Sequence, residues 1–487
     1  MAVAVVKDGK VVMSKGYGVS SLKTKAPMDA NTLVGIASNT KAFTTAALGL
    51  LVDEGKLRWD DKVTDYIPEF KMYDPYVTAE FTVRDLLCHR SGLGLGAGDL
   101  MRYPDSTNFT VHDLIHNLRY FKPASSFRSE YAYDNTLYIV AGEVVARIAK
   151  QPWTSFVETR LLQPLGMRRS ATSFSRLPDP TNVADAHASE DGKVRVVRRH
   201  LGSTADPTGA MFSAGGIYSS VADLSQWALM LLGGPGAPAP LLKPATQWEL
   251  WSPQTLKHLS PGPTFYNTHF AAYGLGWDLT DVGGFKQVSH TGGTVGMVTK
   301  VTLVPDLHLG IIVLTNQEEG LAFQAITTSI MDHYLGVTGQ DRVQTMLGYK
   351  QASAAESDKA TAAAWKQVAL AQRAAPKKAD YSAYIGRYHD AWLGDVNVYQ
   401  QGPQLWLRAV RAPRLVGQVL PYRGSTCVVR WKLRSINADA FATFTLDDQG
   451  RASGLKMKPI SPATDFSYDF QDLDFKRVTE STAGAAQ

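Results

Sequence analysis

The sequence has few cysteines, little net charge and no long apolar run, and each shortage excludes a class of protein. Only two cysteines occur among 487 residues, Cys88 and Cys427, and they lie so far apart that a disulfide framework is not indicated. The 50 basic and 45 acidic residues leave a net charge of +5, and the basic residues are scattered, which argues against nucleic acid as a partner. No stretch approaches the length needed to span a membrane.

The compartment and the oligomeric state are not indicated by the sequence. An apolar strand pattern begins at residue 2, and no signal peptide precedes it. If a leader was removed from a longer precursor, we expect the bacterial periplasm or secretion, and otherwise the cytoplasm. One basic run, at residues 195–200, we interpret as a solvent-exposed strand or loop edge.

The apolar content of 44% allows a large core, divided among two or possibly three domains. An alanine-rich stretch at residues 351–378 predicts a helical linker that ends at Pro376. We place a main domain at residues 1–345, the linker at 346–378 and a second domain at 379–487.

The main domain is predicted to be of mixed α/β (α+β) class, with an antiparallel sheet flanked by helices. Asp8-Gly9 marks a hairpin turn between its first two strands, and later strands are expected at 287–291, 297–304 and 309–315. Residues 99–226 read as helices with long loops, and 321–335 read as a closing helix.

The second domain is predicted to be a small antiparallel barrel, because it contains short runs spaced by turn residues and lacks a helical period. The expected runs are 395–400, 404–410, 414–421, 426–430, 441–446, 454–457 and 466–475. The tail, 479–487, is predicted to be disordered.

The first candidate for chemistry opens an unusually apolar helix at residues 36–55. Ser38 and Lys41 are three residues apart, so their side chains project from the same face. A lysine partly stripped of water can take the proton of a serine hydroxyl and make it a nucleophile. Alone, Ser-x-x-Lys also fits a capping serine with a solvated lysine. A helix this apolar belongs in the centre of a domain, which favours the functional interpretation.

Tyr133 and Asn135 form a second candidate just ahead of an apolar helix. A loop at a helix start can aim a phenol and an amide into a cleft, and a tyrosine near two positive groups loses its proton more easily than in water. A buried core tyrosine beside a helix-capping asparagine would give the same pattern.

The third candidate is Ser289-His-Thr-Gly-Gly-Thr294, where a strand runs into glycines. Such a strand edge can lie against a substrate backbone, and the Gly293 N–H could serve as an oxyanion donor. His290 could orient or protonate a substrate. Alone, the stretch also fits a strand-end turn that contains a histidine.

Two other patterns are weaker. His112 and His116 lie four residues apart on an expected helix, but no third ligand accompanies them, so we interpret them as a surface pair. The glycines of residues 92–98 lack the lysine and hydroxyl of a phosphate-binding loop, and we expect a flexible loop near a cleft, acting as a wall or lid.

The three candidate motifs resemble, in order and spacing, the signature of the penicillin-recognising serine hydrolases, specifically the class C β-lactamase-like branch with its esterases and peptidases. The motifs are Ser38-x-x-Lys41, Tyr133-x-Asn135 and His290-Thr-Gly292. Residues 86–93 and 214–220 are similar to further stretches of that branch, and the resemblance covers about residues 1–335. The region after Pro376 resembles the lipocalin-like barrel that follows this domain in some serine peptidases of the family.

The resemblance implies a role for each motif residue. Ser38 would be the nucleophile, Lys41 and Tyr133 would share general-base work, and the N–H groups of Ser38 and Gly293 would form an oxyanion hole. The residues implied to bind substrate are Asn135, His290, Thr291, Gly292 and Gly293. Neither a metal nor a cofactor is implied.

One departure from the family pattern bears on the substrate. True β-lactamases and transpeptidases usually carry lysine where this chain has His290, which is mostly neutral near pH 7. We therefore expect an acyl-enzyme hydrolase of esters or of small amides and peptides, with weak or no β-lactamase activity. The alternatives are a true β-lactamase or D-amino-acid-type carboxypeptidase, and a non-catalytic penicillin-binding or interaction module.

Overall fold

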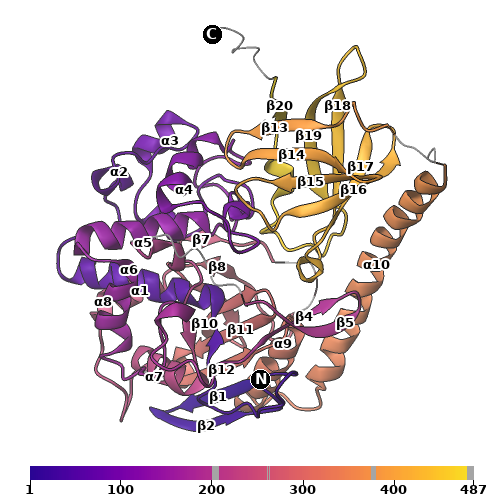
Figure 1. Ribbon diagram of the computed structural model, residues 1–487. Helices are drawn as coiled ribbons and strands as arrows, with labels where there is room; N and C mark the ends of the chain where they lie inside the picture. The colour runs from indigo at the N-terminus through magenta and orange to yellow at the C-terminus, as the bar shows by residue number, and fades with distance from the viewer. Residues whose placement is uncertain (200–207, 260–261, 263, 375–379, 480–487) are drawn as a thin grey trace. The chain divides into compact units, whose positions relative to one another are not determined.

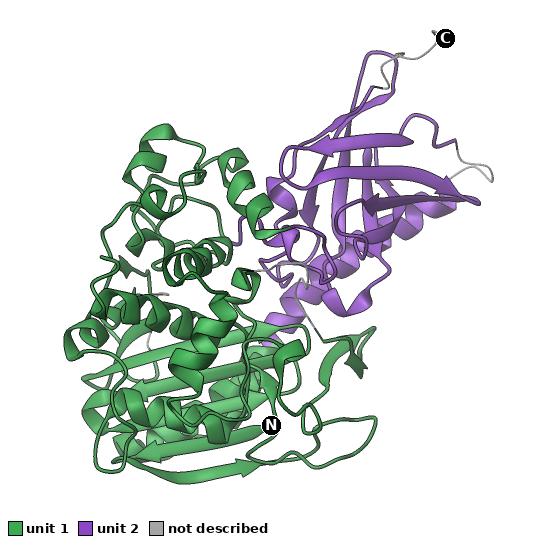
Figure 2. Ribbon diagram, turned by 60° about the vertical axis from the view of Figure 1, so that its left-hand side comes forward, with its two compact units in different colours: residues 1–95, 110–351 green, residues 96–109, 352–487 purple. Residues whose placement is uncertain are grey.

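The structure is a computed structural model that describes residues 1–199, 208–259, 262, 264–374 and 380–479. The chain forms two compact units, and each is built from two stretches of sequence (Figure 2). The first unit comprises Met1–Leu95 and Thr110–Gln351, and the second comprises Gly96–Phe109 and Ala352–Gln487. The chain therefore crosses between the units three times.

An antiparallel sheet of eight strands is the centre of the first unit, in the order β2-β1-β12-β11-β10-β9-β8-β7 (Figure 1). Its strands are β1 (Ala2–Lys7), β2 (Lys10–Gly16), β7 (Thr255–Leu256), β8 (Ala271–Tyr273), β9 (Asp278–Val282), β10 (Phe285–Thr294), β11 (Met297–Val304) and β12 (Leu309–Thr315). The predicted first hairpin and the three later strands are confirmed. The mixed fold class with an antiparallel sheet flanked by helices is also confirmed.

Helices cover both faces of this sheet (Figure 1). The helices of this unit in the described ranges are α1 (Thr40–Asp53), α2 (Val63–Tyr66), α3 (Pro75–Glu80), α4 (Val111–Asn117), α5 (Thr136–Ala149), α6 (Trp153–Val157), α7 (Val221–Leu232), α8 (Pro244–Leu250) and α9 (Gly320–Leu335). One face packs on α9, because alternate residues of β1 and β12 such as Val3, Val5 and Val313 cluster with Met331. The other face packs on the remaining layer, which contains α1 and α7.

The apolar helix predicted at residues 36–55 is confirmed as α1, preceded by the 3₁₀ turn η1 (Ala37–Asn39). Every α1 residue from Thr40 to Leu51 is buried, so this helix has no solvent face over three turns. Such a helix is stabilised by packing on all sides rather than by an amphipathic stripe. It carries the candidate nucleophile into the interior of the unit.

The region expected to be helical with long loops also contains a hairpin that periodicity did not reveal. Its strands are β4 (Ala186–Glu190) and β5 (Lys193–Val197), and a second two-stranded pair joins β3 (Val34–Gly35) to β6 (Tyr218–Ser219). The strand β5 is exposed along nearly all its length, as expected for the basic run, whose last residue, 200, lies outside the described residues.

The second unit is a closed antiparallel barrel, as predicted. Its strands are β13 (Gly386–Asp390), β14 (Gly394–Gln401), β15 (Gln404–Ala409), β16 (Val416–Arg423), β17 (Thr426–Trp431), β18 (Ala440–Leu446), β19 (Ala452–Pro459) and β20 (Phe475–Arg477). The prediction of a strand at 466–475 is wrong. This stretch is a loop with a 3₁₀ turn, η10 (Phe470–Asp472), and only its last residue enters β20. The first strand, β13, was missed.

The inserted segment Gly96–Phe109 is held in the second unit by polar contacts at several points. Asp469 accepts hydrogen bonds from the backbone N–H groups of Gly98 at 2.7 Å and Leu100 at 3.0 Å. The Arg411 guanidinium lies 3.9 Å from the ring centroid of Phe109. The glycine-rich stretch predicted to be a flexible loop is therefore anchored at its far end to the barrel unit.

The helix α10 (Arg342–Ala374) starts nearer the N-terminus than the helical linker predicted from composition, and positions 375–379 are outside the described residues. The tail predicted to be disordered lies outside them from residue 480 onward. None of the helices in the described ranges is long and apolar enough to cross a bilayer. Cys88 and Cys427 are both buried and unpaired, and they belong to different units.

Candidate active site

Ser38 lies in the 3₁₀ turn η1, directly before α1, and is only partly buried. The preceding residue, Ala37, has a φ of 46°, a left-handed conformation that is strained for a residue with a Cβ. Strain of this kind persists only where the surrounding structure enforces it. Here it turns the chain sharply, so that the serine hydroxyl stands at the entrance of a buried helix.

Lys41 is completely buried, and its ammonium group donates three hydrogen bonds. The acceptors are Ser38 Oγ at 3.0 Å, Asn135 Oδ1 at 2.6 Å and the Ala214 carbonyl oxygen at 2.9 Å. These contacts account for all three N–H bonds of an ammonium group. A buried lysine with its cation aimed at a serine is not the solvated lysine of an ordinary capped helix.

The second motif meets the first. Tyr133 is hydrogen-bonded to Ser38, and its ring centroid lies 4.9 Å from Lys41 Nζ. Asn135 is the residue before α5, but its amide does not cap that helix. Asp134 takes the capping role, accepting from Leu137 N at 2.9 Å, so the Asn135 amide is available to Lys41. The capping alternative for Asn135 is thereby excluded.

The third motif lies beside the same turn. A Cβ at Gly292 would lie 2.1 Å from the Ile36 carbonyl oxygen, so only glycine lets β10 approach this closely. Thr299 of β11 locks the approach, accepting from Asn39 Nδ2 at 2.8 Å and donating to Ile36 O at 3.0 Å. Gly293 is exposed, and a Cβ there would meet open space.

The edge of β10 is open where the motif begins. The neighbouring strand β9 pairs only with the part of β10 from Phe285 to Ser289, whereas β11 pairs with it as far as Thr294. Among the described strands, His290 to Thr294 thus have a partner on one side only. Thr291 is exposed within this stretch. A free strand edge next to Ser38 can receive the backbone of an extended substrate.

His290 is buried, and both of its ring nitrogens are engaged. Nδ1 lies 2.6 Å from the carbonyl oxygen of Thr291, and Nε2 lies 2.8 Å from the hydroxyl of Tyr273. Only the tautomer with hydrogen on Nδ1 satisfies both, so Nε2 accepts from Tyr273. Burial lowers the pKa of His290 to about 4, which confirms that it is neutral near pH 7. In this state it holds β8 to β10 rather than presenting a cation.

Two contributors to the site were not recognised from the sequence. Tyr273 is fully buried, and the His89 ring packs at a tilt against both Tyr133 and Tyr273, with ring centroids 4.2 and 4.5 Å away. His89 Nδ1 accepts from Asp134 N at 3.1 Å, and burial lowers the pKa of His89 well below its usual value. The segment 86–93 contained His89, but no local pattern shows which ring it touches.

The prediction that Tyr133 loses its proton easily is wrong for this structure. Loss of solvent around the phenol raises the pKa of Tyr133 well above its ordinary value, and the hydrogen bond from Ser38 opposes that rise only in part. Of the expected cations only Lys41 is present, because His290 is neutral. Tyr133 is therefore a phenol, not a phenolate, in the resting site.

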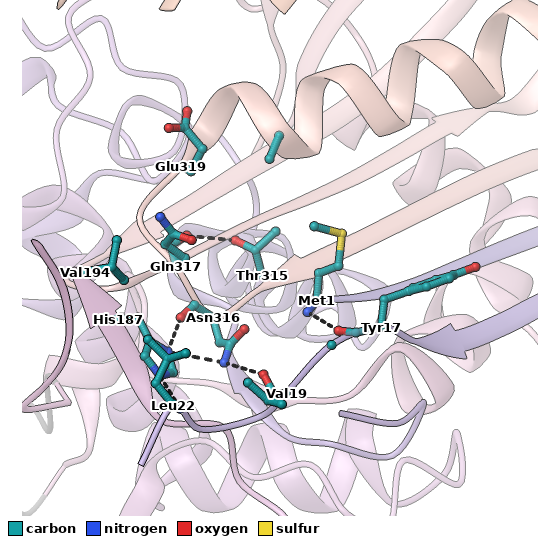
Figure 3. Close-up of a pocket in the computed structure, with 12 residues that line it drawn as sticks. Met1, Tyr17, Val19, Leu22, His187, Val194, Thr315, Asn316, Gln317 and Glu319 are labelled. Atoms are coloured by element: carbon teal, nitrogen blue, oxygen red, sulfur yellow. Dashed lines mark hydrogen bonds between the residues drawn. The ribbon is translucent and has the colours of Figure 1, made fainter. Parts of the chain in front are cut away.

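A cavity of about 360 Å³ lies elsewhere in the first unit (Figure 3). None of the motif residues lines it. His187 lines this cavity and is buried, and both of its ring nitrogens are engaged. Nε2 accepts from Leu22 N at 3.0 Å, and Nδ1 lies 2.6 Å from Asn316 O. Nothing in this cavity competes with Ser38 as a nucleophilic centre.

No group of three or more His, Cys, Asp or Glu side chains suited to a metal ion occurs in the part of the chain that the structure describes. His112 and His116 lie on α4 with ring centroids 6.2 Å apart. His116 is instead 3.4 Å from the Tyr120 hydroxyl. His112 is exposed and His116 is half-buried, as expected of a surface pair.

The chain resembles known proteins over most of its length. Residues 1–334 match the Beta-lactamase family, and residues 370–477 match a domain of unknown function, DUF3471. The chain is 26% identical over 365 residues to Unguisins hydrolase ungD of Aspergillus violaceofuscus, covering 70% of this chain and 63% of that protein. It is 28% identical over 346 residues to Protein flp of Staphylococcus aureus, covering 68% and 63%. The matched region thus spans 63% of the length of these relatives.

Solved structures share the fold. The penicillin-binding protein homologue of Pyrococcus abyssi superposes with a TM-score of 0.60 at 20% identity, covering 97% of this chain and 95% of that chain. The D-amino acid amidase of Ochrobactrum anthropi superposes with a TM-score of 0.53 at 23% identity, covering 71% and 93%. Because the family match extends over residues 1–334, more than half of the chain, the chain belongs to the Beta-lactamase family.

Proposed function

We propose that the chain is a serine hydrolase that forms an acyl-enzyme at Ser38 and acts on neutral esters and on small amides or peptides. The observation that carries this proposal is the hydrogen-bonded series of Lys41, Ser38 and Tyr133. A serine becomes nucleophilic when a neighbouring group accepts its proton, and this series supplies two such neighbours within direct reach.

The two neighbours share the proton transfer. Lys41 donates to Ser38 Oγ, which leaves the serine hydrogen free to point toward Tyr133. At rest the phenol holds its proton, because burial raises the pKa of Tyr133. Ser38 can transfer its own proton only to a member of the pair that is deprotonated at that moment.

The reaction has two steps. In the first, the deprotonated member of the pair takes the Ser38 hydroxyl proton while Oγ bonds to the substrate carbonyl carbon, and the bond to the leaving group breaks as that group takes a proton from Tyr133 or Lys41. In the second, water attacks the acyl carbon, the same pair takes its proton, and Oγ leaves as a hydroxyl. The N–H groups of Ser38 and Gly293 are assigned to the oxyanion, and Asn135 to the substrate amide.

The charge of the site ranks the substrates. His290 stands where a cation would pair with a substrate carboxylate, but its pKa of about 4 leaves it neutral, and both ring nitrogens are engaged. Penicillins and cephalosporins carry such a carboxylate, so we expect them to be hydrolysed weakly or not at all. The name of one relative, a hydrolase of unguisins, also supports amide or ester cleavage rather than a silent binding module.

The test is a substrate panel on the full chain. We expect measurable turnover of p-nitrophenyl acetate and butyrate and little turnover of a chromogenic cephalosporin. Mass spectrometry after a fluorophosphonate should show one adduct on Ser38, absent in Ser38→Ala. Efficient cephalosporin hydrolysis would overturn the substrate ranking, and a folded protein that gains no adduct would favour the non-catalytic alternative.

A further inference from the structure

The strand β11 carries a lysine on a face of the sheet that is otherwise apolar. Lys300 is in register with Val313 of β12, and Val313 belongs to the cluster that packs on α9. Its neighbour Thr299 points the opposite way, toward Asn39 and the Ser38 turn. Lys300 therefore lies on the face of the sheet away from the candidate active site, and only 9% of it is exposed.

The partners of Lys300 among the described residues carry no negative charge. Its Nζ donates to Gln324 Oε1 at 2.6 Å and lies 5.9 Å from the ring centroid of Phe323. Asp278 acts on it only at longer range, and that carboxylate is paired with Lys257 at 2.5 Å. A buried ammonium group is normally compensated by an anion, because removing it from water is costly.

A cavity of about 160 Å³ opens next to this lysine. Its lining is Thr264, Phe265, Tyr266, Thr268, Thr280, Val282, Gln287, Lys300, Gln324, Thr327, Thr328 and Met331. The volume corresponds to roughly five water molecules in the liquid. The cavity is therefore too small for a peptide and large enough for a small ion.

The cavity also contains a hydroxyl that lacks a partner. Thr327 is 3% exposed, and its Oγ1 makes no hydrogen bond to any residue that the structure describes. Thr280 Oγ1 accepts from Gln287 Nε2 at 3.1 Å, which leaves its own hydrogen to donate. Together with the two N–H bonds of Lys300 not used by Gln324, the lining offers donors without an ionised acceptor.

We propose that this cavity binds a small anion, a carboxylate or an oxoanion of about five non-hydrogen atoms, with Lys300 as its counter-charge and Thr327 and Thr280 as hydrogen-bond donors. Burial lowers the pKa of Lys300 to about 8, which still leaves the amine mostly protonated at pH 7. Ser38, Lys41 and Tyr133 do not line this cavity, so anion binding can be tested separately from the proposed hydrolase chemistry.

Thermal unfolding of the full chain at pH 7 and constant ionic strength tests this proposal. Sodium acetate and sodium phosphate are titrated separately against sodium chloride. We expect a saturable rise in Tm with at least one of the two, and the more effective salt tells a carboxylate from an oxoanion. Lys300→Met keeps the aliphatic stem and should abolish the saturable rise. Lys286→Met is the matched control, because Lys286 on β10 donates to Trp251 O and does not line the cavity.

A second variant covers the case in which Lys300→Met does not fold. Thr327→Val keeps the shape of the side chain and removes the unpartnered hydroxyl, and should weaken anion binding roughly threefold to tenfold. An equal response of wild type and Lys300→Met would overturn the proposal, as would the absence of any saturable response in wild type. If Lys300→Met is unfolded, unchanged affinity in Thr327→Val would overturn it.

Discussion

Each unit buries an ionisable side chain where distant parts of the chain meet, but the two arrangements differ in what they leave open. Around Lys41, one of the three acceptors is the hydroxyl of a partly exposed serine. Around Asp469, both donors are backbone N–H groups of Gly98 and Leu100, and the carboxyl is completely buried. A buried polar group thus indicates chemistry when a partner reaches solvent, and structural support when every partner is enclosed.

The largest expected effect is a loss of hydrolysis without a loss of stability, at the serine bonded to Lys41. Ser38→Ala should lower hydrolysis by about 10⁴-fold or more, because the acyl-enzyme can no longer form. The fold should be unaffected, since the serine is partly exposed. Turnover of p-nitrophenyl acetate and the Tm of the variant are the measurements. Residual turnover close to wild type would contradict the assignment of Ser38.

Shortening the chain tests the second region. A chain that ends at Gln351 loses the barrel but keeps Gly96–Phe109, a segment of the second unit whose Leu100, Met101 and Phe109 are completely buried in the intact chain. Exposed apolar side chains promote aggregation, so we expect poor soluble yield. The matched control replaces Gly96–Phe109 by a glycine-serine linker in the same shortened chain and should recover soluble protein. Equal yields would contradict a role for the barrel in covering this segment.

Two tyrosines in the active region sharpen the distinction between a group that moves protons and one that positions its neighbour. Tyr133→Phe removes the phenol bonded to Ser38 and should cost about 10²- to 10⁴-fold in kcat/KM. Tyr273→Phe removes the hydroxyl that donates to His290 and is also hydrogen-bonded to Tyr138, and should cost less than about tenfold. Steady-state kinetics with p-nitrophenyl butyrate compare the two, and equal losses would assign them the same role.

Removing the enclosed carboxyl should affect stability rather than chemistry. Asp469→Ala leaves two buried N–H groups without an acceptor, and we expect the free energy of unfolding to fall by about 2–4 kcal/mol. Asp474→Ala is the control, because Asp474 is exposed and pairs only with surface lysines. Its effect should stay within about 0.5 kcal/mol. Urea unfolding measures both, and fluorophosphonate labelling of Ser38 should persist in each.

The smallest effect expected near pH 7 is a change of stability with pH, and its sign is opposite in the two units. The pKa of His290 falls from 6.5 to about 4, so the unfolded chain binds more protons between these values. The first unit therefore loses stability, up to about 3 kcal/mol, as the pH falls from 6.5 to 4.

The buried carboxyl of Asp469 in the second unit makes stability change with pH in the opposite direction. The pKa of Asp469 is raised well above 3.8 because burial disfavours its charged form. The unfolded chain releases this proton first, so the contribution of Asp469 is lost as the pH rises above about 4. Calorimetry from pH 4 to 8, with Asp469→Asn and His290→Gln as comparisons, separates the two trends. Parallel trends in both units would contradict the burial of one of these groups.

The sequence predicted the elements that carry a local pattern. The apolar helix α1, the strands β10 to β12 and the motif residues follow from periodicity and spacing, and the structure brings Ser38, Lys41, Tyr133 and Asn135 together. The roles assigned to these residues and the domain limits at 345 and 378 remain predictions.

What the sequence could not reveal depends on long-range contacts. Tyr273 has no motif around it. Its hydrogen bond to His290 depends on the pairing of β8 with β9 and of β9 with β10, which joins distant parts of the sequence. The raised pKa of Tyr133 depends on the rings that surround it, including His89. The loop at 466–475 alternates like a strand, but it places Asp469 on Gly98 instead of entering the barrel wall.

The hydrogen bond between Gly98 and Asp469 cannot form until late in the synthesis of the chain. Its two residues are 371 positions apart, so at ordinary ribosomal rates roughly 20 to 75 seconds pass between their appearance. Throughout that interval the second unit, to which the buried Leu100, Met101 and Phe109 belong, is incomplete, although the strands and helices on either side are already being made. Nascent chains caught in this window are natural clients for chaperones, and slower translation of the last third would lengthen their exposure.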